Sequence, residues 1–172
     1  MKSALNLGCG KDVKKSSDTI HWKNVDICQN EGVDAIFDLD VYPWPLDDNQ
    51  FDHVLCNDVL EHLDNVIKAM EEIYRISKPS ATVEISVPYY ASKAAFTDIT
   101  HKRFFTENSM DYFSDAGKYS KYNFYTKVRF RVDLVKLSTV GPRKYLPFKT
   151  LLKTFFLNIV DNIEFYLTVE KA

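Results

Sequence analysis

Short apolar runs, each closed by a polar residue or a glycine, recur along the first half of the chain. Runs of this kind predict strands of a parallel sheet, in which both faces are buried. Later in the chain, residues 128–137 alternate between apolar and charged side chains, which is typical of a strand with one solvated face. Strands are therefore predicted over residues 3–7, 22–27, 33–39, 51–57, 82–87, 128–137 and 162–169.

One segment has clear helical periodicity, with a polar cap at Asp64 or Asn65 in front of it. Its apolar side chains share one face of the helix. They are Val66, Ile67, Met70, Ile73 and Tyr74. Further helices are predicted over residues 58–63, 106–115 and 147–160, and a long loop over residues 91–105.

The polar segment at residues 11–19 lacks helical periodicity, and Val13 is its only apolar residue. A crossover helix between parallel strands needs an apolar stripe to cover the sheet. We therefore expect a loop or a short turn here, beside a partly uncovered sheet face. The order of strands and helices predicts a single α/β domain over residues 1–172, with about seven strands.

Composition narrows the function classes. A net charge of −2 gives no electrostatic support to a nucleic-acid partner. The first residues lack the apolar segment of a signal peptide, and no apolar run has the length of a membrane span, so we expect a cytoplasmic protein. Cys9, Cys28 and Cys56 lie near predicted strand ends but lack the paired spacing of metal ligands. We interpret them as reduced thiols and predict no metal site.

The first predicted strand ends in a Gly-x-Gly turn, within residues 5–10 (Leu-Asn-Leu-Gly-Cys-Gly). Glycines allow a backbone to approach a ligand without an intervening side chain. The next three predicted strands end near Asp26, Asp38 and Asn57. Because the carboxyl ends of parallel strands meet at one edge, these residues predict a ligand crevice there.

Together these motifs resemble the class I S-adenosylmethionine-dependent methyltransferases, of the small kind called methyltransferase type 11. The resemblance covers roughly residues 3–106 and is carried by residues 5–10, 25–27, 37–40, 44–52 and 54–63. It implies a Rossmann-like three-layer sandwich with a mostly parallel sheet of strand order 3-2-1-4-5-7-6, whose last strand is antiparallel. It also implies methyl transfer from S-adenosylmethionine, with S-adenosylhomocysteine as the product.

The resemblance assigns the cofactor contacts. Asp26 would accept hydrogen bonds from the two ribose hydroxyls, because a carboxylate can serve a cis diol with two strong acceptors. Asp38 would accept from the adenine amine while Leu39 packs on the ring, and Asn57 would lie near the transferable methyl group. The full set of implied cofactor residues is Gly8, Cys9, Gly10, Asp26, Ile27, Asp38, Leu39, Asn57 and Asp58.

Two positions of the first motif depart from the family pattern. Asn6 stands where an acidic residue is usual, and Asp12 stands where a third glycine is common. Asn6 could still hold a water that bridges to the cofactor's ammonium group, but without the charge. Asn6 and the short first connection leave an alternative open, namely a non-catalytic S-adenosylmethionine-binding protein with a regulatory or scaffold role.

His62 and His101 are the candidate catalytic residues, since a histidine can accept a proton from a substrate hydroxyl or amine near neutral pH. For both, hydrogen bonding of a loop to the scaffold is the alternative, and for His62 we favour it. Residues 91–117 are expected to form the substrate loop and helix. The candidate substrate-binding residues are Tyr89, Tyr90 and Arg103.

The acceptor is expected to be a small molecule or a sugar-type substrate. Residues 57–60 (Asn-Asp-Val-Leu) lack the Asn-Pro-Pro-Tyr type of segment found in enzymes that methylate adenine or glutamine amides. Residues 147–160 interleave lysines with apolar side chains, which fits a core helix better than a membrane-surface or partner-binding helix. Formation of a homodimer is an alternative that the sequence also leaves open.

Overall fold

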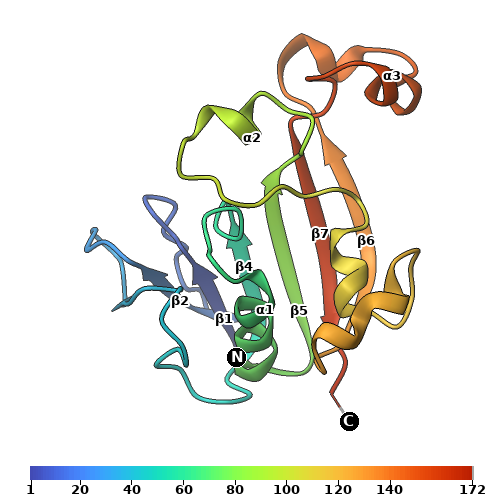
Figure 1. The fold of residues 1–172 in the computed structure, drawn as a ribbon. Coiled ribbons are helices and arrows are strands. Elements are labelled where there is room, and N and C mark those ends of the chain that lie inside the picture. The colour runs from blue at the N-terminus through green and yellow to red at the C-terminus, as the bar shows by residue number, and fades with distance from the viewer. Residues whose placement is uncertain (172) are drawn as a thin grey trace.

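Seven strands form one mixed sheet in the computed structural model, which describes residues 1–171 (Figure 1). The strands are β1 (Lys2–Leu7), β2 (Ile20–Asp26), β3 (Ala35–Ile36), β4 (Phe51–Asn57), β5 (Ser77–Pro88), β6 (Phe130–Ser138) and β7 (Asn162–Val169). Their order is β3-β2-β1-β4-β5-β7-β6, and β7 runs antiparallel to both of its neighbours. The predicted α/β Rossmann-like fold, with its strand order and reversed last strand, is confirmed.

The core lies between the sheet and α1 (Val66–Ile76). Every second residue of β7 from Ile163 to Val169 is at most 2% exposed. Met70 and Ile73 of α1 are completely buried, and the side chain of Asn65 caps the first turn of the helix as predicted. Of the apolar face read from the sequence, Met70 and Ile73 lie in the core, whereas Ile67 is exposed.

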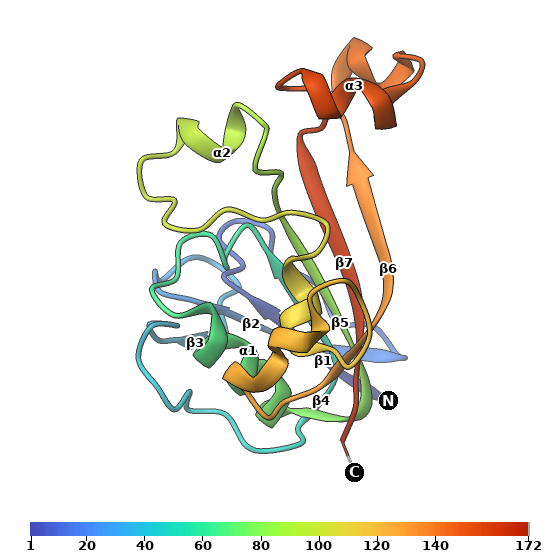
Figure 2. The same ribbon diagram turned by 45° about the vertical axis from the view of Figure 1, so that its right-hand side comes forward.

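No helix of the described residues covers the other face of the sheet, so the predicted third layer is missing (Figures 1 and 2). The connection between β1 and β2 is a loop held by two buried amides instead of an apolar stripe. Asn6 Nδ2 donates to the carbonyl of Asp12 at 2.8 Å and to Asn24 Oδ1 at 3.1 Å, and the backbone N–H of Lys14 donates to Asn24 Oδ1 at 2.8 Å. The loop predicted from the polar segment is present, and hydrogen bonds hold it in place.

Residues 58–63 form turns rather than the predicted short helix. Asp58 has a φ of 52°, and its backbone N–H donates to the carbonyl of Ser86 at 2.8 Å. This bond and the positive φ turn the chain away from helical geometry directly after β4. The strand predicted over residues 33–39 is also shorter, because only the two residues of β3 pair with β2 at the sheet edge.

In the predicted substrate segment, a short helix lies where a loop was predicted, and the α-helix predicted after that loop is missing. A short helix, α2 (Ala94–Thr97), lies within the predicted loop. The helix predicted over residues 106–115 is a single 3₁₀ turn, η1 (Ser109–Phe113), followed by a second one, η2 (Ser120–Tyr125). Instead of capping an α-helix, the backbone N–H of Thr106 donates to Ser109 Oγ at 2.8 Å.

The helix predicted over residues 147–160 is reduced to α3 (Lys149–Phe155), preceded by the 3₁₀ turn η3 (Gly141–Tyr145). Our preferred interpretation of this segment as a core helix is wrong. It projects beyond the ends of β6 and β7 and covers neither sheet face (Figures 1 and 2). Six apolar side chains there are each at least 59% exposed: Tyr145, Phe148, Leu151, Phe155, Phe156 and Leu157.

No helix in the described part of the chain is both long enough and apolar enough to cross a lipid bilayer.

A largely buried ion pair on α1 holds the aromatic segment between β3 and β4. Glu72 Oε2 accepts from Arg75 Nη2 and from the backbone N–H of Trp44, both at 2.7 Å. Arg75 also donates to the carbonyls of Trp44 and Leu46, at 3.0 and 2.8 Å. Trp44 Nε1 in turn donates to the carbonyl of Leu39 at 3.0 Å, so the ion pair fixes the chain at the end of β3.

We expect Glu72→Ala to lower the free energy of unfolding by about 3 kcal/mol, because it removes the more buried of the two carboxylates that pair with Arg75 and leaves the Trp44 N–H without its acceptor. Asp48→Ala is the matched control, since Asp48 pairs with the same arginine but its side chain is 67% exposed. It should change stability by about 1 kcal/mol or less. Urea unfolding measures both variants, and equal losses would contradict the role assigned to Glu72.

Candidate active site

A cavity of about 390 Å³ opens at the carboxyl ends of β1, β2 and β4. Its lining contains many of the strand-end residues that the sequence singled out. These are Gly8, Asp26, Ile27, Asp38, Leu39 and Asp58, joined by Asp40, Val59, His62 and Leu63. The other implied cofactor residues, Cys9, Gly10 and Asn57, follow or end the same strands but do not line the cavity.

The glycine turn begins the connection from β1 to β2, and its first glycine, Gly8, lines this cavity. Gly8 has a φ of 61°, and a Cβ atom there would lie 2.4 Å from Val59 Cγ2. The backbone N–H of Cys9 donates to the carbonyl of Val25 at 2.9 Å, and that of Gly10 donates to Asp26 Oδ2 at 2.7 Å. Only glycine combines this backbone conformation with so close an approach of a neighbouring side chain.

The Asp26 carboxylate is oriented by the chain itself. Oδ2 accepts from Gly10, and Oδ1 accepts from the backbone N–H of Cys28 at 2.9 Å. Each carboxylate oxygen has more than one acceptor site, so both can still accept a hydrogen bond from a ligand. Asp38 is held in a similar way, because its Oδ1 accepts from the backbone N–H of Asp40 at 2.8 Å.

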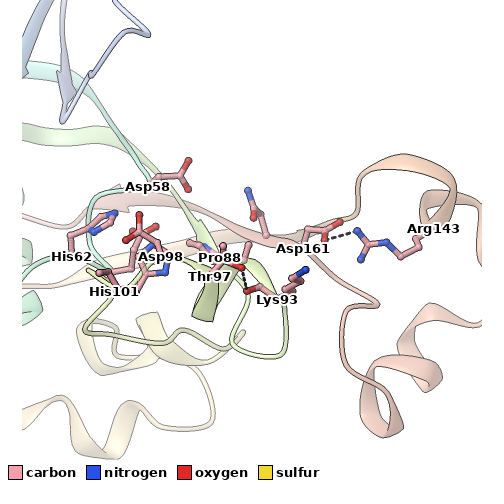
Figure 3. A pocket seen from close by; sticks show the side chains of 13 residues that line it. Asp58, His62, Pro88, Lys93, Thr97, Asp98, His101, Arg143 and Asp161 are labelled. Carbon is pink, nitrogen blue, oxygen red and sulfur yellow. Dashed lines mark hydrogen bonds and ion pairs between the residues drawn. The ribbon is translucent and has the colours of Figure 1, made fainter. Parts of the chain in front are cut away.

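A second cavity of about 880 Å³ lies next to the first, between β5, α2 and the start of β7. Asp58 and His62 line both cavities, so the two meet at these side chains. Figure 3 shows His62, His101, Asp58 and Asp98 gathered at one end of the larger cavity and the Arg143–Asp161 ion pair at the other.

Both candidate histidines reach this junction, with ring centroids 4.7 Å apart. Thr100 Oγ1 donates its only hydrogen to Asp98 at 2.7 Å, so it accepts from His62 Nδ1 at 2.9 Å. His101 Nδ1 lies 3.0 Å from the carbonyl of Ala95, to which it can only donate. In the neutral imidazoles, the lone pair is therefore on Nε2 of each ring.

Glu61 is the residue of this site that the sequence analysis missed. Its side chain is only 1% exposed, and neither carboxylate oxygen has a hydrogen-bond partner within residues 1–171. Burial raises the pKa of Glu61 to about 8, and the nearby charges of Asp58 and Asp98 add to the effect. The signal available in the sequence was the acidic residue directly before His62.

The three candidate substrate residues do not line the larger cavity. Tyr89 and Tyr90 border a separate cavity of about 400 Å³, together with Glu107 and residues of η1. Tyr89 is buried, and its hydroxyl donates to Glu107 Oε2 at 3.2 Å. Arg103 lines neither the larger cavity nor this separate one. Its guanidinium donates instead to the backbone carbonyls of Asp64 and Lys102.

Asn6 is likewise absent from the lining of the cavities at the strand ends. Its amide is 3% exposed and is used to hold the loop that follows the glycine turn. The departure from the family's acidic residue therefore has a structural explanation in the short first connection.

Comparison with known families gives one match. Residues 5–85 match a family model described as a methyltransferase domain. This segment contains the glycine turn and every strand-end residue that lines the smaller cavity. A comparison with curated proteins found no match. The match and the fold confirm the resemblance to the class I S-adenosylmethionine-dependent methyltransferases.

Solved structures share the fold at low sequence identity. An S-adenosylmethionine-dependent methyltransferase from Archaeoglobus fulgidus is 18% identical, with a TM-score of 0.63 over 97% of this chain and 86% of that one. The methyltransferase in a complex with the activator Trm112 from Haloferax volcanii is 13% identical, with a TM-score of 0.61 over 99% and 83%. A cyclase, SpnF, is 12% identical, with a TM-score of 0.62 over 99% and 75%.

We expect Gly8→Ala to lower the free energy of unfolding by about 2–4 kcal/mol, from the left-handed backbone and the contact with Val59 together. Gly10→Ala is the matched control, since Gly10 also has a positive φ, of 50°, but has open space where a Cβ would lie. It should cost about 1–2 kcal/mol, for the backbone alone.

Adding Val59→Ala to Gly8→Ala removes the methyl group that a Cβ at residue 8 would meet. The double variant should therefore be more stable than the sum of the single losses implies, by about 1 kcal/mol. Urea unfolding of the full cycle measures this coupling. Strictly additive losses would show that the packing of Val59 on Gly8 does not constrain the turn.

Proposed function

We propose that this protein is an S-adenosylmethionine-dependent methyltransferase that binds its cofactor in the smaller cavity and a small-molecule or sugar-type acceptor in the larger one. The observation that carries the proposal is the junction of the two cavities at Asp58 and His62. Methyl transfer requires two ligands whose reacting atoms meet, and the chain provides two cavities that share Asp58 and His62 in their linings.

The residues of the smaller cavity suit this cofactor. Asp26 presents oriented acceptors for the ribose hydroxyls, and Ile27, Leu39, Val59 and Leu63 supply apolar surface for the adenine ring. The volume of about 390 Å³ falls within the usual range of small-molecule sites. When bound, the cofactor supplies an electrophilic methyl group.

The protein's own contribution is alignment of the two ligands and, where the acceptor needs it, removal of a proton. Holding two reactants in a reactive geometry can lower a barrier by about 7–11 kcal/mol. The Nε2 lone pairs of His62 and His101 lie at the junction, where an acceptor hydroxyl or amine would lose its proton. Asp38 and Asp58 complete the polar surface around the proposed cofactor.

We expect wild-type protein to bind both S-adenosylmethionine and S-adenosylhomocysteine, and Asp26→Ala to weaken both by about 10- to 100-fold. Each hydrogen bond to a charged acceptor contributes about 1.5–3 kcal/mol, and about 1.4 kcal/mol corresponds to a factor of ten. Isothermal titration calorimetry measures the affinities. The exposed Asp18→Ala variant should bind like wild type.

Circular dichroism must show that Asp26→Ala is folded, because Asp26 also accepts from two backbone N–H groups. Unchanged affinity in a folded Asp26→Ala variant would refute the ribose assignment. A wild-type protein that binds neither ligand would refute the proposed function as a whole.

A second candidate function, a cofactor-binding scaffold without catalysis, is favoured by the exposed apolar surface around α3. We call this surface the α3 patch. It comprises Tyr145, Phe148, Leu151, Phe155, Phe156 and Leu157. Lys144 and Lys149 lie among these side chains, a combination that suits the surface of an anionic membrane. The Haloferax volcanii neighbour, a methyltransferase bound to an activator, shows that this fold can serve in a complex.

We expect the wild-type protein to sediment with vesicles that contain phosphatidylserine and the double variant Phe148→Ser/Phe155→Ser to remain in the supernatant. Burying each of these side chains in the lipid interface contributes about 1.5–3 kcal/mol, so the loss of two should abolish binding. Phe124→Ser is the control, since Phe124 is 69% exposed but lies outside the patch.

Analytical ultracentrifugation of the same proteins tests the homodimer. If the wild type self-associates but does not bind vesicles, and the double variant is monomeric, the α3 patch would be a dimer interface. Wild-type protein that is monomeric and does not bind vesicles would contradict both roles.

A further inference from the structure

Three side chains with metal-binding atoms converge beside the junction of the two cavities. One ligand atom from each of Glu61, His62 and His101 lies within 4.8 Å of the other two. The three residues also line the larger cavity, where Figure 3 shows His62 and His101 next to each other. Two come from the turn after β4 and one from the loop after α2, and backbone hydrogen bonds from Lys102 and Arg103 to the carbonyl of Glu61 join these segments.

The carboxylate of Glu61 gives the first reason to expect a cation here. It is almost completely buried, and no donor reaches either oxygen within residues 1–171. Buried carboxylates are normally paired, hydrogen-bonded or bound to a metal, because an isolated charge is costly to remove from water. The two imidazole rings beside it are the groups with which this carboxylate can share an ion.

The histidines give the second reason, because each has one ring nitrogen engaged and the other free. Nδ1 of His101 is held by the carbonyl of Ala95, and Nδ1 of His62 by Thr100, which in turn donates to Asp98. Metal-binding histidines usually donate their second ring N–H in this way, which fixes the ring and its tautomer. Both Nε2 lone pairs therefore remain available for coordination.

We propose that Glu61, His62 and His101 bind a divalent transition metal ion, of which Zn²⁺ is the representative. Two imidazoles and one carboxylate are a donor set of zinc enzymes and of non-haem iron sites, whereas Mg²⁺ and Ca²⁺ prefer oxygen ligands alone. Three protein ligands leave at least one coordination position open. The prediction of no metal site rested on the spacing of the cysteines, which carries no information about these three residues.

The open position gives the ion a role at the junction, and this role, unlike metal binding itself, rests on the proposed function. In the metal-bound form, the two histidines are ligands rather than proton acceptors. An acceptor hydroxyl that coordinates the ion would have a lower pKa and would lose its proton more readily. The site therefore favours acceptors that present an oxygen atom to the metal.

The test is calorimetric titration of the chelator-treated, full-length protein with ZnCl₂, repeated with CoCl₂ while the visible absorption of Co²⁺ is recorded. We expect one ion per chain in the wild type. His62→Ala and His101→Ala should each weaken binding by about 10- to 100-fold or more, because even second-shell changes have effects of this size.

Two controls address other ligands on the surface. His21 is an exposed histidine on β2, and Cys28 is an exposed thiol. His21→Ala and Cys28→Ser should both bind the ion as tightly as the wild type. MgCl₂ should give no comparable heat.

Glu61→Gln tests the carboxylate with a side chain of the same shape. Zn²⁺ should raise the melting temperature of the wild type but leave that of Glu61→Gln nearly unchanged, and circular dichroism checks that each variant is folded. Absence of saturable binding by the wild type, or equal binding by the histidine variants, would overturn the proposal. These measurements use no S-adenosylmethionine, so their failure is distinct from a failure of cofactor binding.

Discussion

The parallel hydrogen bonding of β1 to β2 on one side and to β4 on the other sets the position of the candidate cofactor residues at the ends of these three strands. In this register, Leu7 lies beside Val25 and Cys56, so the three strands end side by side. Each strand then delivers its next residues to the same edge of the sheet. The glycine turn, Asp26 and Asp58 form one cavity because the backbone ladder permits no other relative placement of the strand ends.

The molecule uses two buried glutamates in opposite ways. Glu72 lies on α1, and its carboxylate accepts from Arg75 and Trp44, so the charge is fully compensated and ties the segment before β4 to the core. Glu61 has no partner for either oxygen within the described residues. Buried polar groups that lack partners are rare in stable proteins, and two of the three such atoms within the described residues belong to Glu61, beside the cavity junction.

The short connection between β1 and β2 affects both the covering of the sheet and the role of Asn6 in the first motif. A crossover helix would cover β1 and β2 with apolar side chains, but here the amides of Asn6 and Asn24 hold a polar loop instead. The residue that departs from the family's acidic position is therefore part of the scaffold. A cyclase also shares this fold, so the architecture alone does not fix a reaction.

The sequence by itself determined the strands, their order, the capped helix α1 and the set of strand-end residues, because apolar periodicity and a recognisable motif encode local structure and topology. Tertiary structure alone decided three things. It turned residues 58–63 away from a helix through the bond between Asp58 and Ser86, and it left α3 exposed beyond the sheet. It also brought His101 to Glu61 and His62, across about forty residues of chain, since contacts between distant loops leave no periodic signal in a sequence.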